Sequence, residues 1–148
     1  MAHEAMIEWA RPERLHRDAM VLAEQAVAEA DARIAQRLFR AAFDNERRAA
    51  EELAEALEAE PTRSVLYRSA ASLAADCGEY SEAERLAGEG LAGRPPAEIA
   101  DELRGLLSQV KEYEPIRLRS WFVAEPPPSK AEEADEGAKQ KEDESSKE

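Results

Sequence analysis

The sequence predicts an all-α protein, and three observations support that prediction. Of the 148 residues, 30 are alanine, whereas aromatic residues make up only 5% and β-branched residues are sparse. This composition favours helices over sheets. Apolar residues recur at helical spacing, and prolines and glycines divide the chain into helix-length segments. The larger apolar side chains suffice for one small core, so we expect a single folded domain.

The first two helices are expected on either side of Asp31. Pro12 suits the first turn of a helix. Residues 13–60 contain no proline or glycine, and as one helix they would extend about 70 Å at 1.5 Å per residue. Asp31 is the only good N-cap residue between two apolar stripes in this stretch. We therefore expect a break at 29–31.

Prolines and glycines also predict the later boundaries. Pro61 ends the second helix, and Thr62 and Ser64 are candidate caps for the third. The Gly-Glu-Tyr sequence at 78–80 predicts a tight interhelical turn, after which the Ser-x-x-Glu sequence at 81–84 fits a capping box.

A last helix is expected after the Gly-Arg-Pro-Pro sequence at 93–96, and it should end before Pro115. Beyond it, residues 116–123 alternate in the manner of a short extended strand. The helix has an apolar stripe made of Ile99, Leu103, Leu106, Leu107 and Val110.

The C-terminal 24 residues have a different composition. From Glu125 onward there are nine acidic residues, four lysines and no apolar residue except alanine. Such a segment does not bury enough apolar surface to offset its ordering entropy. We expect a disordered acidic tail at 125–148 and a folded domain at 1–124.

Small residues recur in a pattern that is typical of paired helices. Offsets of 0, 3, 4 and 7 are occupied by Tyr67, Ala70, Ala71 and Ala74, and again by Ala19, Leu22, Ala23 and Ala26. The following helices show Ala83, Ala87 and Pro95 in one unit, and Ala35 and Phe39 in the other. This spacing resembles the tetratricopeptide repeat, with its W-x₂-L-G-x₂-Y first helix, A-x₃-F second helix and terminal proline. The sequence departs from that pattern where alanine replaces most of the large residues.

The two units differ in where their proline lies. Pro95 follows Ala83 by 12 residues, whereas Pro61 follows Ala35 by 26 residues, which is 14 more. That excess is close to four helical turns, so an insertion would keep the same face inward. We expect one overlong second helix, roughly 32–59, with Phe39 and Leu53 on the same side. Its first half should pack on 16–29 and its second half on 64–76. A plain antiparallel bundle and a long coiled coil are the alternatives.

Charge and motifs exclude several function classes. The net charge of −13 disfavours nucleic acids and anionic membrane surfaces. There is no signal-peptide pattern at the N-terminus and no apolar run of membrane-spanning length. Cys77 is the only cysteine, which fits a cytoplasmic location.

Residues that could perform catalysis are few and scattered. His3 and His16 are the only histidines, and we interpret them as a terminal residue and a solvated side chain. Cys77 is interpreted as a small packed residue. There is no phosphate-binding glycine loop and no metal-ligand motif, so we expect no enzyme activity, no cofactor and no metal.

Two surfaces are candidate protein-binding sites. The resemblance to tetratricopeptide repeats implies binding by the face of the first helices, which here presents Arg17, Met20, Glu24 and Val27, and then Val65, Arg68, Ser72 and Asp76. The second candidate is the segment at 114–123, because Trp and Arg are typical hot-spot residues. Its candidate residues are Arg117, Arg119, Trp121 and Phe122. The alternative, which we favour, is that this segment folds back over its own last helix.

These features predict a cytoplasmic adaptor or scaffold that binds a protein partner without catalysis. Two repeat units are fewer than the three or more that usually give a stable array. A self-associating structural or regulatory subunit, including a homodimer, is therefore an alternative. An acidic chaperone or inhibitor of a basic partner is another. Neither nucleic acid nor membrane is an expected partner.

The repeat alignment predicts that Ala71 and Ala83 are buried where paired helices meet. An Ala83→Leu substitution should then overpack the contact and destabilise the fold by about 1–3 kcal/mol. Thermal unfolding measures the effect. An unchanged melting temperature would show that the alignment is wrong at this position.

Overall fold

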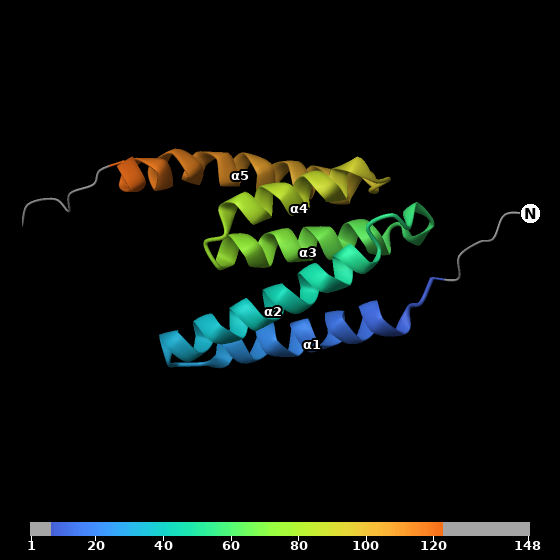
Figure 1. Cartoon of the computed structure of the whole chain (residues 1–148), viewed down its shortest axis with the longest axis horizontal. Helices are drawn as coiled ribbons and strands as arrows, with labels where there is room; N and C mark the ends of the chain where they lie inside the picture. The colour runs from blue at the N-terminus through green and yellow to red at the C-terminus, as the bar shows by residue number, and fades with distance from the viewer. Residues whose placement is uncertain (1–6, 123–148) are drawn as a thin grey trace, which may run out of the picture. The chain divides into compact units, whose positions relative to one another are not determined.

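The computed structural model describes residues 7–122, and their side chains as far as Tyr113. These residues form five α-helices, with no strand among them, so the all-α prediction is confirmed for this part of the chain. The chain divides within the last helix into two units, residues 1–114 and 115–148. In order the elements are α1 (Ala10–Ala28), α2 (Ala32–Glu52), a 3₁₀ turn η1 (Leu57–Ala59), α3 (Thr62–Asp76), α4 (Tyr80–Ala92) and α5 (Ala97–Phe122) (Figure 1).

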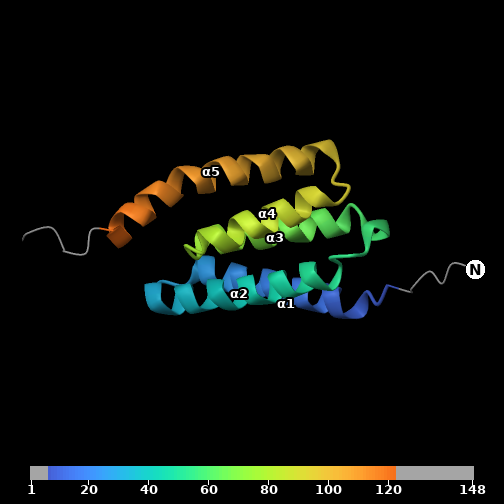
Figure 2. The same cartoon turned by 45° about the horizontal axis from the view of Figure 1, so that its top comes forward.

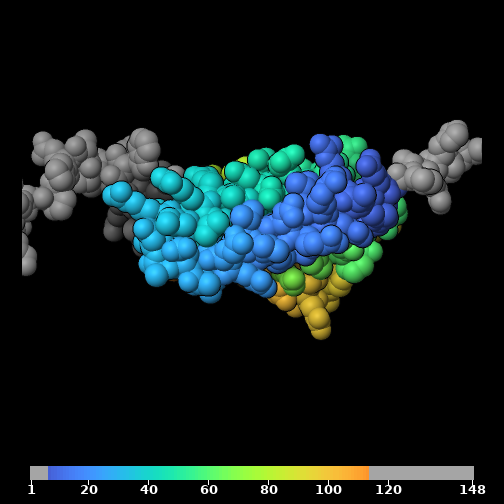
Figure 3. Space-filling model, turned by 90° about the horizontal axis from the view of Figure 1, so that it is seen from below, coloured from blue at the N-terminus to red at the C-terminus, as the bar shows by residue number. Residues whose placement is uncertain are grey.

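Helices α1 and α2 form an antiparallel hairpin. The predicted break is confirmed, because the Asp31 carboxylate caps α2 by accepting hydrogen bonds from the backbone amides of Arg33, at 2.9 Å, and Ile34, at 3.4 Å. At the opposite end of the hairpin, Arg11 pairs with Glu52 at 3.4 Å. Both views of the ribbon show the two helices side by side (Figure 2). In Figure 3, α1 lies along one face of the molecule with the start of α2 beside it.

The predicted overlong helix at 32–59 is wrong, because α2 ends at Glu52 and the chain turns before η1. The cause is a tertiary contact. The Arg63 side chain, only 2% exposed, donates from Nε to the carbonyl oxygen of Ala54 at 2.8 Å. This hydrogen bond holds the turn that follows α2 against α3, in a position that a continued helix would not reach. Leu53 is nevertheless buried in the core, and Phe39 packs half-buried against the same core.

Helix α2 contacts both of its neighbours along its length, so the predicted division of its two halves is also wrong. Arg11, at the start of α1, reaches the last residue of α2. Glu79, just beyond α3, pairs with Arg40 in the first half of α2 at 2.8 Å. The physical reason is that both neighbours run antiparallel to α2, so the start of α1 lies against the end of α2, and the end of α3 lies against the first half of α2.

The turn between α3 and α4 is where the sequence placed it. Gly78 has φ +74°, a left-handed conformation that favours glycine. The predicted caps of α3 and α4 are wrong. The residues at the two N-cap positions are Pro61 and Glu79, and neither makes a capping side-chain hydrogen bond. The carboxylate of Glu60 accepts from the Ser64 amide at 3.2 Å instead. The Glu60 side chain, which lies in the turn before α3, therefore takes the place of the expected Thr62 cap.

Alanines let the helices approach closely in the core. Ala71 and Ala83 are fully buried, as the repeat alignment predicted, and both belong to the continuous core cluster. Gly90 marks a close approach between helices, because a Cβ there would lie 3.0 Å from the Tyr67 Cβ of α3 and 3.0 Å from a Leu103 methyl group of α5. Small residues thus set the spacing of three helices.

Helix α5 contributes the predicted apolar stripe. Leu103 and Val110 are buried, and Ile99, Leu106 and Leu107 pack against the core. The expected end before Pro115 and the expected extended segment at 116–123 are wrong, because the helix runs to Phe122. Pro115 removes one helical hydrogen bond and its ring crowds the preceding turn, but residues 116–122 contain no glycine or asparagine that would end the helix in a left-handed conformation.

Two glycines within α4 offer a matched test of this packing. Gly88 is exposed with open space beside it, so Gly88→Ala should stabilise the fold by about 0.5–1 kcal/mol through helix propensity. Gly90→Ala should instead destabilise it by about 1–3 kcal/mol, because the Tyr67 Cβ is fixed to the backbone of α3. Urea denaturation compares the two variants. If Gly90→Ala is as stable as Gly88→Ala, α4 does not approach α3 this closely.

Candidate protein-binding groove

A groove runs between α3 and α5 along the exposed side of α3. It consists of two adjoining depressions of about 360 and 230 Å³, which share Ser72 and Leu106. We call it the α3–α5 groove. Its lining residues are Arg68, Ser69, Ser72, Ala75 and Asp76 from α3, Tyr80 from α4, and Glu102, Leu106, Gln109, Val110 and Tyr113 from α5.

The two ends of the α3–α5 groove differ in chemistry. At one end Arg68 pairs with Glu102, with 2.7 Å between Nη1 and Oε2. At the other end the rings of Tyr80 and Tyr113 stack, with centroids 5.7 Å apart and planes 11° from parallel. An exposed ion pair of this kind contributes about 0–1 kcal/mol, so the Arg68 guanidinium is available to exchange partners.

The middle of the groove combines neutral polar groups with an apolar side chain. Ser72 and Gln109 provide hydroxyl and amide groups, and Leu106 lies between them. Burial raises the pKa of the Asp76 carboxyl at the edge of the groove. Such a mixture suits hydrogen bonding to a peptide backbone together with contact to one apolar side chain.

The structure brings only part of the predicted binding face together. Arg68, Ser72 and Asp76 line the α3–α5 groove, but none of the predicted α1 residues lies there. On α1, Met20 is half-buried, whereas Arg17 and Glu24 are exposed. The side chains of the last predicted group, Arg117, Arg119, Trp121 and Phe122, lie outside the described residues.

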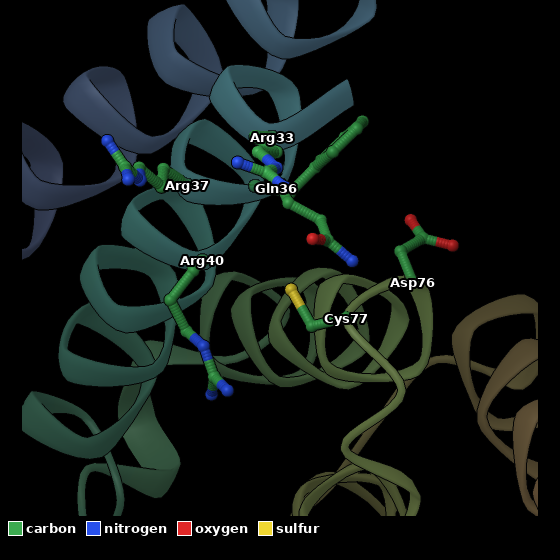
Figure 4. A pocket seen from close by; sticks show the side chains of 7 residues that line it. Arg33, Gln36, Arg37, Arg40, Asp76 and Cys77 are labelled. Atoms are coloured by element: carbon green, nitrogen blue, oxygen red, sulfur yellow. The ribbon is translucent and has the colours of Figure 1, made fainter. Parts of the chain in front are cut away.

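A second cleft lies between the first half of α2 and the end of α3, and the sequence reasoning missed it. Its volume is about 490 Å³. Figure 4 shows Asp76 and Cys77 facing Gln36 and Arg40 across it. The signal for it was present in the sequence, because arginines at 33, 37 and 40 share one face of a helix. The full lining is Arg33, Gln36, Arg37, Phe39, Arg40, Asp76 and Cys77.

Cys77 is a half-buried packed residue at this cleft. Burial raises the pKa of its thiol, an effect that the nearby Arg40 guanidinium only partly opposes. The thiol is therefore protonated at neutral pH, and the neutral thiol is a poor nucleophile. Among the side chains that the structure describes, residues 7–113, no three His, Cys, Asp or Glu side chains are arranged to hold a metal ion.

His16 is not the freely solvated side chain that the sequence suggested. Its Nδ1 lies 2.8 Å from Oε1 of Glu46, whose side chain is fully buried. Burial raises the pKa of the Glu46 carboxyl, while His16 and the Ser69 hydroxyl lower it in part. This cluster links α1, α2 and α3, because each helix provides one of its three residues.

Comparisons with protein-family models, with curated protein sequences and with solved structures give no match to this chain. None of the helices in the described part of the chain is both long enough and apolar enough to span a membrane.

The raised pKa of Glu46 predicts how stability depends on pH. Above the folded-state pKa the buried carboxylate costs stability, and below its ordinary pKa it is protonated and costs none. Glu46→Gln keeps the shape without the charge, so its melting temperature should exceed that of the wild type at neutral pH. The gain should decrease as the pH falls through the folded-state pKa of Glu46 and vanish below its ordinary pKa.

Thermal melts across this pH range measure the difference between the two proteins. The control is Glu24→Gln, at an exposed position of α1 where the difference should stay close to zero. A gain for Glu46→Gln that grows toward acid pH would contradict the assignment of Glu46 as a destabilising buried charge.

Proposed function

We propose that this protein is a non-catalytic protein-interaction module that binds a short extended peptide segment of its partner in the α3–α5 groove. The observation behind the proposal is the composition of that groove, in which Arg68, Ser72 and Gln109 place polar groups around Leu106. This is the chemistry by which a rigid helical scaffold holds an extended chain.

The length of the groove supports a short ligand. From Arg68 to Asp76 the helix rises about 12 Å. An extended chain covers about 3.3 Å per residue, so about four residues of a peptide would fit. The stacked rings of Tyr80 and Tyr113 close one end and offer an aromatic surface for an apolar terminal side chain.

The helix arrangement supports the same proposal. Helices α1 and α2, and then α3 and α4, form successive antiparallel pairs, and α5 follows as a final helix. We propose that this is a short tetratricopeptide-like array, in which α3 presents the binding face and α5 acts as the cap. The fully buried Ala70, Ala71 and Ala74 of α3 and Ala83 of α4 match that interpretation.

Ser72→Arg tests the groove directly. Ser72 is exposed at the point where the two depressions join, so a long charged side chain there blocks the groove without entering the core. The matched control is Ser108→Arg, an exposed serine of α5 that does not line the groove. Random peptides are selected by display against the full-length chain, and their affinities are then measured by fluorescence anisotropy.

We expect the selected peptides to bind the wild type and Ser108→Arg equally. Binding to Ser72→Arg should be at least about tenfold weaker, which corresponds to about 1.4 kcal/mol. Equal binding to all three proteins would place the peptide site elsewhere, and failure to select any peptide would argue against the proposed function.

A further inference from the structure

The cleft between α2 and α3 concentrates arginine on an acidic protein, and we call it the basic cleft. The chain as a whole has a net charge of −13. Three of the seven residues that line the cleft are nevertheless arginines, and only one is acidic. Arg33, Arg37 and Arg40 recur at intervals of four and three residues, so they lie on one side of α2. The basic cleft is therefore a local cationic site.

Two of the three arginines have no ion-pair partner. Arg40 pairs with Glu79 at 2.8 Å, but Arg33 and Arg37 form no ion pair among the residues that the structure describes. Arg33 also stands beside the N-terminus of α2, where the helix dipole disfavours a cation. These two exposed guanidinium groups thus stabilise the fold neither through ion pairs nor through the dipole, and both are available to a ligand.

The opposite wall of the basic cleft does not neutralise these arginines. Asp76 and Cys77 stand on that wall (Figure 4), but no ion pair in the described part of the chain includes Asp76. Burial raises the pKa of the Asp76 carboxyl, and no guanidinium group offsets that rise. An anionic ligand is therefore expected along the α2 wall and away from Asp76.

The arrangement of the guanidinium groups indicates the kind of anion. Figure 4 shows the Arg37 and Arg40 side chains pointing in different directions from α2. A single phosphate group would need guanidinium groups that converge on one point. A chain that has several carboxylates can instead contact separate arginines one after another. The arrangement therefore favours an acidic peptide segment over one phosphate group.

The spacing of the two unpaired arginines matches an extended acidic segment. Arg33 and Arg37 are four positions apart in α2, which corresponds to a rise of about 6 Å. Alternate residues of an extended chain lie about 6.6 Å apart and point to the same side. Carboxylates at alternate positions can therefore reach one arginine each. Gln36 offers an amide that can form hydrogen bonds with the backbone of the segment.

We propose that the basic cleft binds an extended acidic segment of a partner protein, with aspartate or glutamate at alternate positions. The carboxylates pair with Arg33 and Arg37, because a guanidinium group binds a carboxylate through two parallel hydrogen bonds. Phe39, half-buried at the cleft, offers an aromatic surface to the aliphatic parts of the segment. Asp76 also lines the α3–α5 groove, but none of the three arginines does. The proposal therefore stands independently of the proposed function.

Two labelled peptides and three full-length proteins test the proposal. The probe is a fluorescein-labelled heptapeptide with glutamate at alternate positions, and the control peptide has glutamine there. The wild type is compared with R33Q/R37Q, which removes both unpaired guanidinium groups. The matched control R14Q/R48Q removes two exposed arginines that also form no ion pair in the described part of the chain and do not line the cleft. Circular dichroism checks folding, and fluorescence anisotropy measures binding.

We expect the acidic probe to bind the wild type and R14Q/R48Q with the same affinity. Its binding to R33Q/R37Q should be at least about tenfold weaker, and the glutamine peptide should not bind. Binding to the wild type should also weaken between about 0.15 M and about 1 M salt, because salt screens the ion pairs. Failure of the acidic probe to bind the wild type overturns the proposal, as does an equal affinity for the two variants.

Two further measurements separate the acidic segment from other occupants. A phosphoserine peptide without glutamate that binds more tightly than the acidic probe would overturn the proposal in favour of a phosphate site. Sedimentation velocity of the proteins alone tests a second copy of the chain as the occupant. A wild type that self-associates, together with R33Q/R37Q that stays monomeric, would overturn the assignment to a separate partner.

Discussion

The buried guanidinium of Arg63 is the interaction on which the rest of this structure depends. It donates to the carbonyl oxygen of Ala54 at 2.8 Å and to that of Glu89 at 3.1 Å, and it lies 4.8 Å from the centre of the Tyr67 ring. One side chain thus ties the end of α2 to α3 and α4. Leaving a buried charge of this kind without its partners costs about 3–5 kcal/mol.

Glu60 is the ion-pair partner of Arg63, and it also binds the backbone of the segment that leads into α5. Its carboxylate lies 3.5 Å from the Arg63 guanidinium and accepts hydrogen bonds from the backbone amides of Ser64 and Arg94, each at 3.2 Å. Gly93 leaves room for this ion pair, because a Cβ there would lie 2.3 Å from Arg63 Nη1 and would displace the guanidinium. The pair therefore fixes both the entry into α3 and the exit from α4.

The proposed binding groove follows from that arrangement. Once α3 and α4 are positioned by Arg63, α5 packs against Gly90 of α4 through Leu103, and the exposed strip of α3 that faces α5 becomes the α3–α5 groove. Helix α2 buries its alanine-rich side against α1 and α3, so its charged side is left facing solvent.

The sequence by itself determined the features that depend on local backbone chemistry. The all-helical class followed from composition, the break at Asp31 from its capping carboxylate, and the turn at Gly78 from its left-handed φ. Tight packing at Ala71 and Ala83 followed from side-chain spacing. In each case the cause lies within a few residues of the effect.

Only the tertiary structure decided the features that join residues distant in the sequence. Helix α2 ends at Glu52, although the local composition would continue it, and the turn that follows is held by the buried Arg63, which donates to the Ala54 carbonyl. His16 meets Glu46 across 30 residues, and Arg68 meets Glu102 across 34. The α3–α5 groove exists only because packing brings those two helices side by side. No local pattern fixes such contacts, because a buried polar group takes its partner from whichever segment the fold places within hydrogen-bonding distance.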